Sequence, residues 1–176
     1  MNDNLKLPGT PLKKSDFKEG KVLIIEDEIE AEYDWSVGPA MARFLEELKR
    51  GKIIGRKCPK CGKVYVPPRM FCPECFTPTT KWVYVKDTGT VNTAVVSYIS
   101  ADRGHLGEPV VIGVIHLDGA SPMMGFVHKI KGVSPEDVKN MKVFGLKVKA
   151  VWKPEKERTG SITDIMYFEP IEEGEQ

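Results

Sequence analysis

The sequence Cys58-Pro59-Lys60-Cys61-Gly62 is followed, ten residues after its second cysteine, by Cys72-Pro73-Glu74-Cys75. Two Cys-x-x-Cys pairs at this spacing supply four thiolates, the ligand set of a closed tetrahedral zinc site. Because four thiolates leave no coordination position open, we expect one structural zinc ion per chain, held by Cys58, Cys61, Cys72 and Cys75. Two disulfides or a rubredoxin-like iron site would use the same four residues.

The turn that follows each cysteine pair differs between the two motifs. Gly62 can adopt the positive φ that such a turn needs after the second sulfur. The second motif has Phe76 at the equivalent position, so we expect its turn to be distorted.

The composition is that of a soluble globular protein, with 41% apolar and 29% charged residues in 176. No apolar run is long enough to span a membrane, and the first residues lack the apolar stretch of a secretory signal. We therefore expect a cytoplasmic protein without a membrane partner, in a compartment where disulfides are rare.

Charge is unevenly distributed along the chain. Residues 52–87 contain eight basic and two acidic side chains, a net charge of +6, between flanks of −3 and −2. This basic central segment is either the binding surface for a local anionic partner or a solvated lysine-rich face.

The N-terminal part is expected to be an arm over residues 1–34, with a short strand at Lys21–Ile25, followed by an amphipathic helix within residues 35–52. Pro39 suits the first turn of this helix and Gly51 suits its end. The apolar face of the helix must dock on the rest of the chain or on another subunit. Its members, at helical spacing, are the candidate partner interface: Met41, Phe44, Leu45 and Leu48.

Strand patterns dominate from residue 87 onward. The expected strands are Thr90–Ser100, Pro109–Leu117, Met123–Ile130, Lys147–Trp152 and Ser161–Phe168. A short helix capped by Ser134 falls between the third and fourth strands, and this order is typical of an OB-fold barrel.

The fold class is therefore mainly β, with an N-terminal helical segment, a rubredoxin-like zinc ribbon and a five-stranded OB-fold barrel. The ribbon is assigned to residues 53–86, the barrel to 87–170 and an acidic tail to 171–176. Each of the two β modules is expected to bury a core of its own.

The sequence contains no recognisable catalytic set. It has no nucleophile elbow, phosphate-binding loop or dinucleotide-binding glycine motif, and all four cysteines are assigned to the metal. We therefore expect no catalytic residues. His116 and His128 fall in expected strands, whereas His105 lies in an expected loop between the first two barrel strands and is a candidate ligand contact.

The stretch from Phe44 to Arg69, with its helix end, first cysteine pair and Pro67-Pro68-Arg69 step, resembles a known family. So does Thr88-Gly89-Thr90-Val91 at the start of the barrel. This zinc-ribbon plus OB-fold family was first catalogued as a domain of unknown function and is described as acyl-CoA-associated. The resemblance covers roughly residues 35–170.

The resemblance implies a non-catalytic companion of thiolase-like enzymes. In archaea it implies a bridge between acetoacetyl-CoA thiolase and hydroxymethylglutaryl-CoA synthase of the mevalonate route, with a contribution to CoA or acyl-CoA binding. Basic side chains of the ribbon could meet CoA phosphates, and the candidates are Arg56, Lys63, Arg69 and Lys81. A single-stranded nucleic-acid binder is the alternative, disfavoured because residues 88–176, which contain the barrel and the acidic tail, have a net charge of −2.

Overall fold

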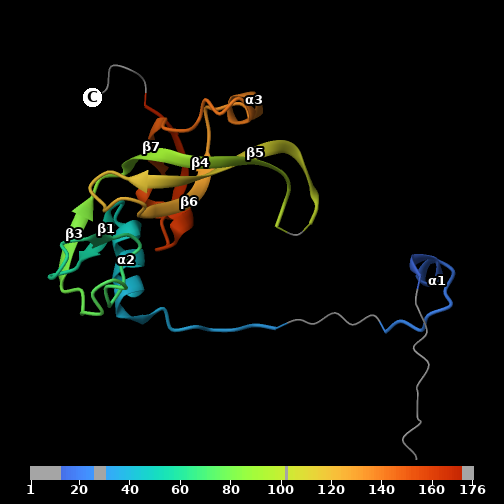
Figure 1. The fold of residues 1–176 in the computed structure, drawn as a ribbon, viewed down its shortest axis with the longest axis horizontal. Helices are drawn as coiled ribbons and strands as arrows, with labels where there is room; N and C mark the ends of the chain where they lie inside the picture. The colour runs from blue at the N-terminus through green and yellow to red at the C-terminus, as the bar shows by residue number, and fades with distance from the viewer. Residues whose placement is uncertain (1–12, 26–30, 102, 172–176) are drawn as a thin grey trace, which may run out of the picture. The chain divides into compact units, whose positions relative to one another are not determined.

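The computed structural model describes residues 13–25, 31–101 and 103–171, which fall into two units, Met1–Trp35 and Ser36–Gln176. In the first unit, Lys14–Lys18 form the short helix α1 (Figure 1). Lys21–Ile25, which the sequence led us to expect as a strand, have no regular secondary structure. Residues 1–12 and 26–30 of the expected arm, and residues 172–176 of the expected acidic tail, lie outside the described residues.

The second unit begins with helix α2 (Gly38–Lys49), with Pro39 in its first turn and Gly51, at φ +72°, just beyond its end. Near its C-terminal end, the buried carboxylate of Glu47 accepts hydrogen bonds from Arg50 Nη1 at 3.0 Å and from the Tyr84 hydroxyl at 3.1 Å. The bond from Tyr84 links the end of the helix to the ribbon, whereas the bond from Arg50 is local to the helix end. No helix among the described residues is long and apolar enough to cross a membrane.

The ribbon is a three-stranded antiparallel sheet in the order β2-β1-β3. Its strands are β1 (Ile53–Lys57), β2 (Val64–Tyr65) and β3 (Lys81–Val85). Both cysteine motifs lie outside the strands, the first between β1 and β2 and the second between β2 and β3.

The barrel follows at once and is closed, in the strand order β4-β5-β6-β8-β7, with β7 pairing back onto β4. Its strands are β4 (Thr88–Ile99), β5 (His105–Leu117), β6 (Gly125–Ile130), β7 (Lys147–Trp152) and β8 (Ile165–Pro170). Helix α3 (Pro135–Lys139) lies between β6 and β7, and the 3₁₀ turns η1 (Glu155–Glu157) and η2 (Ile162–Asp164) precede β8. This is the OB-fold topology expected from the sequence.

Strand β5 begins earlier than expected. The sequence predicts a loop at His105, but this residue is the first of β5 and pairs with Ile99 of β4, so β5 starts before the predicted Pro109. A glycine at 107 favours a turn, but it lies inside β5, and the β4–β5 ladder accommodates the extension with a register shift between Ser97 and Ile99.

Helix, ribbon and barrel share one hydrophobic core. The cluster contains Phe44 and Leu48 of α2 and Ile53 and Ile54 of β1, together with Ile115, Phe126 and other barrel residues. The expectation of separate cores is therefore wrong. The Phe44 and Phe126 rings lie 5.9 Å apart between centroids, and Phe44 and Leu48 are at most 1% exposed. Their burial inside the chain corrects the expectation that these two side chains contact a partner.

Candidate metal centre

The two cysteine motifs form two nearly equivalent turns. In the first, the Gly62 N–H donates to the Cys58 carbonyl at 3.0 Å, and in the second the Phe76 N–H donates to the Cys72 carbonyl at 2.9 Å. Gly62 has φ +76° and Phe76 has φ +53°. The expected distortion at Phe76 is therefore absent, because this phenylalanine adopts the left-handed conformation that glycine provides in the first turn.

The turns bring the four predicted ligands together. All four sulfur atoms lie within 4.8 Å of one another, and Cys61 Sγ lies 3.7 Å from Cys72 Sγ. None of the four cysteines is in a disulfide. A tetrahedral zinc ion with Zn–S bonds of about 2.3 Å holds its sulfurs about 3.8 Å apart, so the cluster fits such an ion. An ion held by all four thiolates would have a structural role.

Hydrogen bonds to the sulfurs prepare them for a metal. The backbone N–H of Cys61 donates to Cys58 Sγ at 3.5 Å, which lowers the pKa of Cys58 to about 6. The N–H of Cys75 donates to Cys72 Sγ at 3.4 Å. Burial raises the pKa of Cys72, but the hydrogen bonds from Tyr65 and from the backbone outweigh it and the net shift is downward. Burial raises the pKa of Cys75, so its proton must be displaced when a metal binds.

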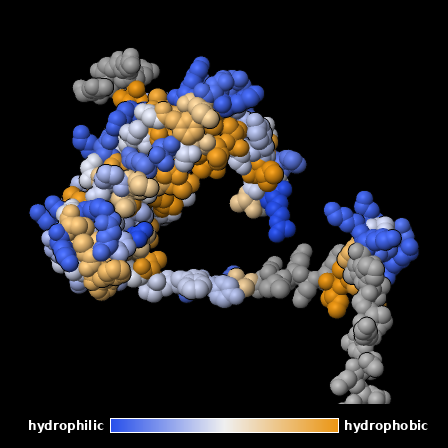
Figure 2. Space-filling view, viewed as in Figure 1, coloured by the Kyte–Doolittle hydropathy of each residue, from blue (hydrophilic) through white to orange (hydrophobic). Residues whose placement is uncertain are grey.

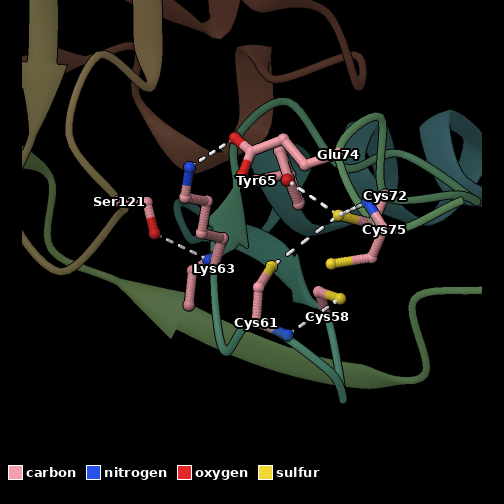
Figure 3. Close-up of polar contacts among 9 residues, drawn as sticks. Cys58, Cys61, Lys63, Tyr65, Cys72, Glu74, Cys75 and Ser121 are labelled. Atoms are coloured by element: carbon pink, nitrogen blue, oxygen red, sulfur yellow. Dashed lines mark hydrogen bonds and ion pairs between the residues drawn. The ribbon is translucent and has the colours of Figure 1, made fainter. Parts of the chain in front are cut away.

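Two contacts around the sulfurs were not anticipated from the sequence. The hydroxyl of Tyr65, fully buried at the end of β2, lies 3.1 Å from Cys72 Sγ, and Lys63 forms an ion pair with Glu74 (Figure 3). The ion pair links the segment after the first turn to the second turn. The spacing of the cysteines in the sequence does not predict either contact, because both contacts depend on the orientation of the two turns relative to each other.

Tyr65→Phe is expected to weaken zinc binding by about 10- to 100-fold, the usual cost of removing a hydrogen bond to a metal ligand. The Tyr65 hydroxyl stabilises the Cys72 thiolate and lowers its pKa, so its loss raises that pKa and lets protons compete better. Half-release of zinc on acidification should therefore occur at a higher pH than in the wild type. Chelator competition across a pH series measures both effects.

The matched control is Tyr98→Phe, which removes the hydroxyl of an exposed tyrosine on β4. It should leave the zinc affinity and the pH of release unchanged. Equal zinc affinity of Tyr65→Phe and the wild type would show that the Tyr65 hydroxyl does not support the metal.

The four candidate phosphate contacts have different surroundings. The Arg56 guanidinium donates to the Thr79 carbonyl and lies 4.8 Å from the centroid of the Trp82 ring, and Lys63 pairs with Glu74. Arg69 and Lys81 are exposed. Two of the four therefore serve contacts within the ribbon, and two present their side chains to solvent.

An apolar groove of about 480 Å³ lies beside helix α2. Its lining includes Met41, Leu45, Phe126, Val127 and Ile162. A second hollow of about 470 Å³ shares Val127 and Ile162 with this groove and is also bordered by Lys129 and Lys153. Met41 and Leu45, the two half-buried members of the expected interface, thus remain accessible from this groove. His105 is exposed and lies outside both linings.

Residues 45–80 match the rubredoxin-like zinc ribbon domain of ChsH2, and residues 82–153 match the C-terminal OB-fold domain of ChsH2. A curated relative from Methanocaldococcus jannaschii, a DUF35 domain-containing scaffold protein, is 33% identical over 123 residues. That match covers 68% of this chain and 82% of the relative.

Two solved structures are similar as well. A DUF35-family protein of unknown function from Sulfolobus solfataricus has 32% identity and a TM-score of 0.51, covering 65% of this chain and 78% of that chain. The Ltp2-ChsH2(DUF35) aldolase structure has a TM-score of 0.55 over 78% of this chain and 98% of the matched chain. Since its identity is 18%, this second likeness shows the fold alone.

Proposed function

Because this chain belongs to the DUF35 family of zinc-ribbon and OB-fold proteins, we propose that it is a non-catalytic scaffold subunit of an acyl-transfer enzyme complex. Its partners are acetoacetyl-CoA thiolase and hydroxymethylglutaryl-CoA synthase. It bridges these two enzymes in the cytoplasm and assists the transfer of the acyl-CoA intermediate between them in the mevalonate pathway.

The observation that carries this proposal is the 33% identity with a relative named as a scaffold protein, over 82% of that relative. The site agrees with a scaffold. All four cysteines of the chain lie in one cluster, and four thiolates around zinc leave no position for a substrate. Bridging two enzymes requires surfaces, and the groove that includes Met41 and Leu45 offers an apolar one.

The structure of the ribbon also narrows the proposed contribution to CoA binding. CoA carries phosphates, which basic side chains bind through charge-assisted hydrogen bonds. Arg69 and Lys81 are exposed, whereas Arg56 and Lys63 are held by groups of the ribbon itself. We therefore assign the phosphate contacts to Arg69 and Lys81.

The double variant Arg69→Ala/Lys81→Ala is expected to weaken CoA binding by the assembled complex roughly 30-fold, since it removes two charged hydrogen bonds that each contribute on the order of 1 kcal/mol at an exposed site. Titration calorimetry with CoA measures this. Lys139→Ala/Lys142→Ala, which removes two exposed lysines at and just after the end of α3, is the control and should have no effect. If the Arg69→Ala/Lys81→Ala variant binds CoA as tightly as the control variant and the wild type, these two basic side chains do not contact CoA and belong to a solvated face.

The scaffold proposal is tested by tagging this chain in the organism that encodes it and identifying the proteins that co-purify. Thiolase and hydroxymethylglutaryl-CoA synthase are expected together. Recovery of RNA or single-stranded DNA in place of both enzymes would contradict the proposal and favour a nucleic-acid-binding function, which zinc ribbons and OB-folds also support.

A further inference from the structure

Three apolar side chains are exposed at the second cysteine turn of the ribbon. Met70, Phe71 and Phe76 are 40%, 61% and 84% exposed, and we call these three residues the ribbon tip. An isolated bridge between Phe71 and Pro78 holds the two sides of this turn together. In the space-filling view, apolar surface lies among hydrophilic side chains over the ribbon (Figure 2).

Phe76 is unfavourable for the fold in two respects. Its φ of +53° lies in the left-handed region, where a side chain with a Cβ is less stable than glycine, and the equivalent residue of the first turn is Gly62. Its aromatic ring is also largely exposed to water, so packing within the chain does not compensate for the backbone conformation. Burial of the Phe76 ring against another molecule would supply the stabilising contact that is missing within the chain.

The charge around the ribbon tip has one sign. Residues 57–81 contain five basic side chains and a single acidic one, Glu74, which pairs with Lys63. Lys57 and Lys60 are exposed, in addition to Arg69 and Lys81, which we assign to the phosphate contacts. A surface with exposed aromatic rings and surplus cations is complementary to an apolar socket rimmed by carboxylates.

We propose that the ribbon tip inserts Phe71 and Phe76 into an apolar, carboxylate-rimmed socket on one of the two partner enzymes. This inference rests on the proposed function and names one of the two surfaces that a bridge needs. Exposed aromatics with basic neighbours also occur in proteins that bind single-stranded nucleic acid, where bases stack on the rings. The two rings here lie on a tight turn, whereas nucleic-acid grooves place successive aromatics along an extended basic surface.

The test uses the full-length protein and each of the two purified enzymes in separate binding measurements. Phe76→Gly places in the second turn the residue that the first turn has, so zinc content should stay at one per chain and the melting temperature should equal or exceed that of the wild type. Its affinity for one of the enzymes should fall by at least about tenfold, as expected for a buried aromatic anchor, and its affinity for the other should not change. Phe71→Ser should weaken binding to the same enzyme.

Salt dependence and a control variant test the proposed contact further. The affinity of the wild type for that enzyme should decrease as NaCl is raised, since opposite charges face each other across the contact. The control is Tyr98→Ser, which removes an aromatic ring that is 58% exposed on β4. It should leave binding to that enzyme unchanged.

The outcomes separate this inference from the proposed function. If the wild type binds the enzymes and Phe76→Gly and Phe71→Ser bind both equally well, the ribbon tip is not a docking surface, while the scaffold function stands. If the wild type binds neither enzyme, both are overturned. Binding of a 20-nucleotide oligo(dT), or self-association, that Phe76→Gly abolishes would also overturn the assignment, because the tip would then have a different occupant.

Discussion

Cys58→Ser is expected to abolish stoichiometric zinc binding and to lower the melting temperature of the whole chain by more than about 10 °C. Cys58 Sγ is buried and accepts the N–H of Cys61, so a serine in its place leaves the metal with three thiolates. Without zinc the two turns lose their common anchor. Because Ile53 and Ile54 of the ribbon belong to the same core as the barrel, loosening the ribbon exposes barrel residues as well.

Elemental analysis and amide hydrogen exchange measure the two parts of this prediction. Zinc should fall from about one per chain to a trace, and protection should decrease in barrel strands as well as in β1 to β3. Lys60→Ala, which changes an exposed side chain in the same turn, is the control and should retain zinc. Barrel strands that keep full protection in the zinc-free variant would show that the two modules are independent after all.

Phe44→Asp is expected to destabilise the fold by at least about 3–5 kcal/mol, the usual cost of removing a buried phenylalanine, before the burial of a charge is counted. Phe44 is 1% exposed and packs against Phe126 of the barrel. For a chain of this length the loss corresponds to a fall in melting temperature of roughly 6–20 °C. Thermal and denaturant unfolding measure it.

The matched control is Ala42→Asp on the exposed side of the same helix, with an expected loss below about 1 kcal/mol from helix propensity alone. A Phe44→Asp variant as stable as Ala42→Asp would contradict the shared core. It would return Phe44 to the role of a partner contact, which the amphipathic pattern of the helix allows equally well.

Local motifs explain why the metal ligands were predictable from the sequence. Each Cys-x-x-Cys turn is closed by a hydrogen bond between residues four apart, so its shape follows from adjacent residues, and both pairs converge as expected. The order of strands in the barrel was predictable for a similar reason. The run Lys147–Trp152 alternates in polarity, and its predicted bounds are those of β7, whereas the other four strands begin or end at other residues than predicted.

Tertiary contacts explain what the sequence could not reveal. The apolar face of α2 fits a partner or the chain itself equally well, and only the packing of Phe44 on Phe126 distinguishes the two. The hydrogen bond from Tyr65 to Cys72 joins residues whose proximity depends on the turn between them. Lys21–Ile25 are rich in strand-forming residues but adopt no strand, since such propensity is only realised where neighbouring strands provide a packed surface.

The exposed fractions of the basic side chains could not be predicted either. Eight cations in residues 52–87 look equivalent in the sequence. In the structure, Arg56 lies against Trp82 and Lys63 pairs with Glu74, so neither is as available to an external anion as Arg69 or Lys81. The distinction depends on cross-strand partners such as Trp82, which faces Arg56 in the β1–β3 ladder.

The central claim, that this chain bridges two enzymes, is tested most directly by measuring the mass of mixtures of the three purified proteins with size-exclusion chromatography and light scattering. The thiolase and the synthase should elute separately when mixed alone, and as one species containing all three proteins when this chain is added. Two enzymes that stay separate in its presence, or that associate equally well in its absence, would contradict the claim.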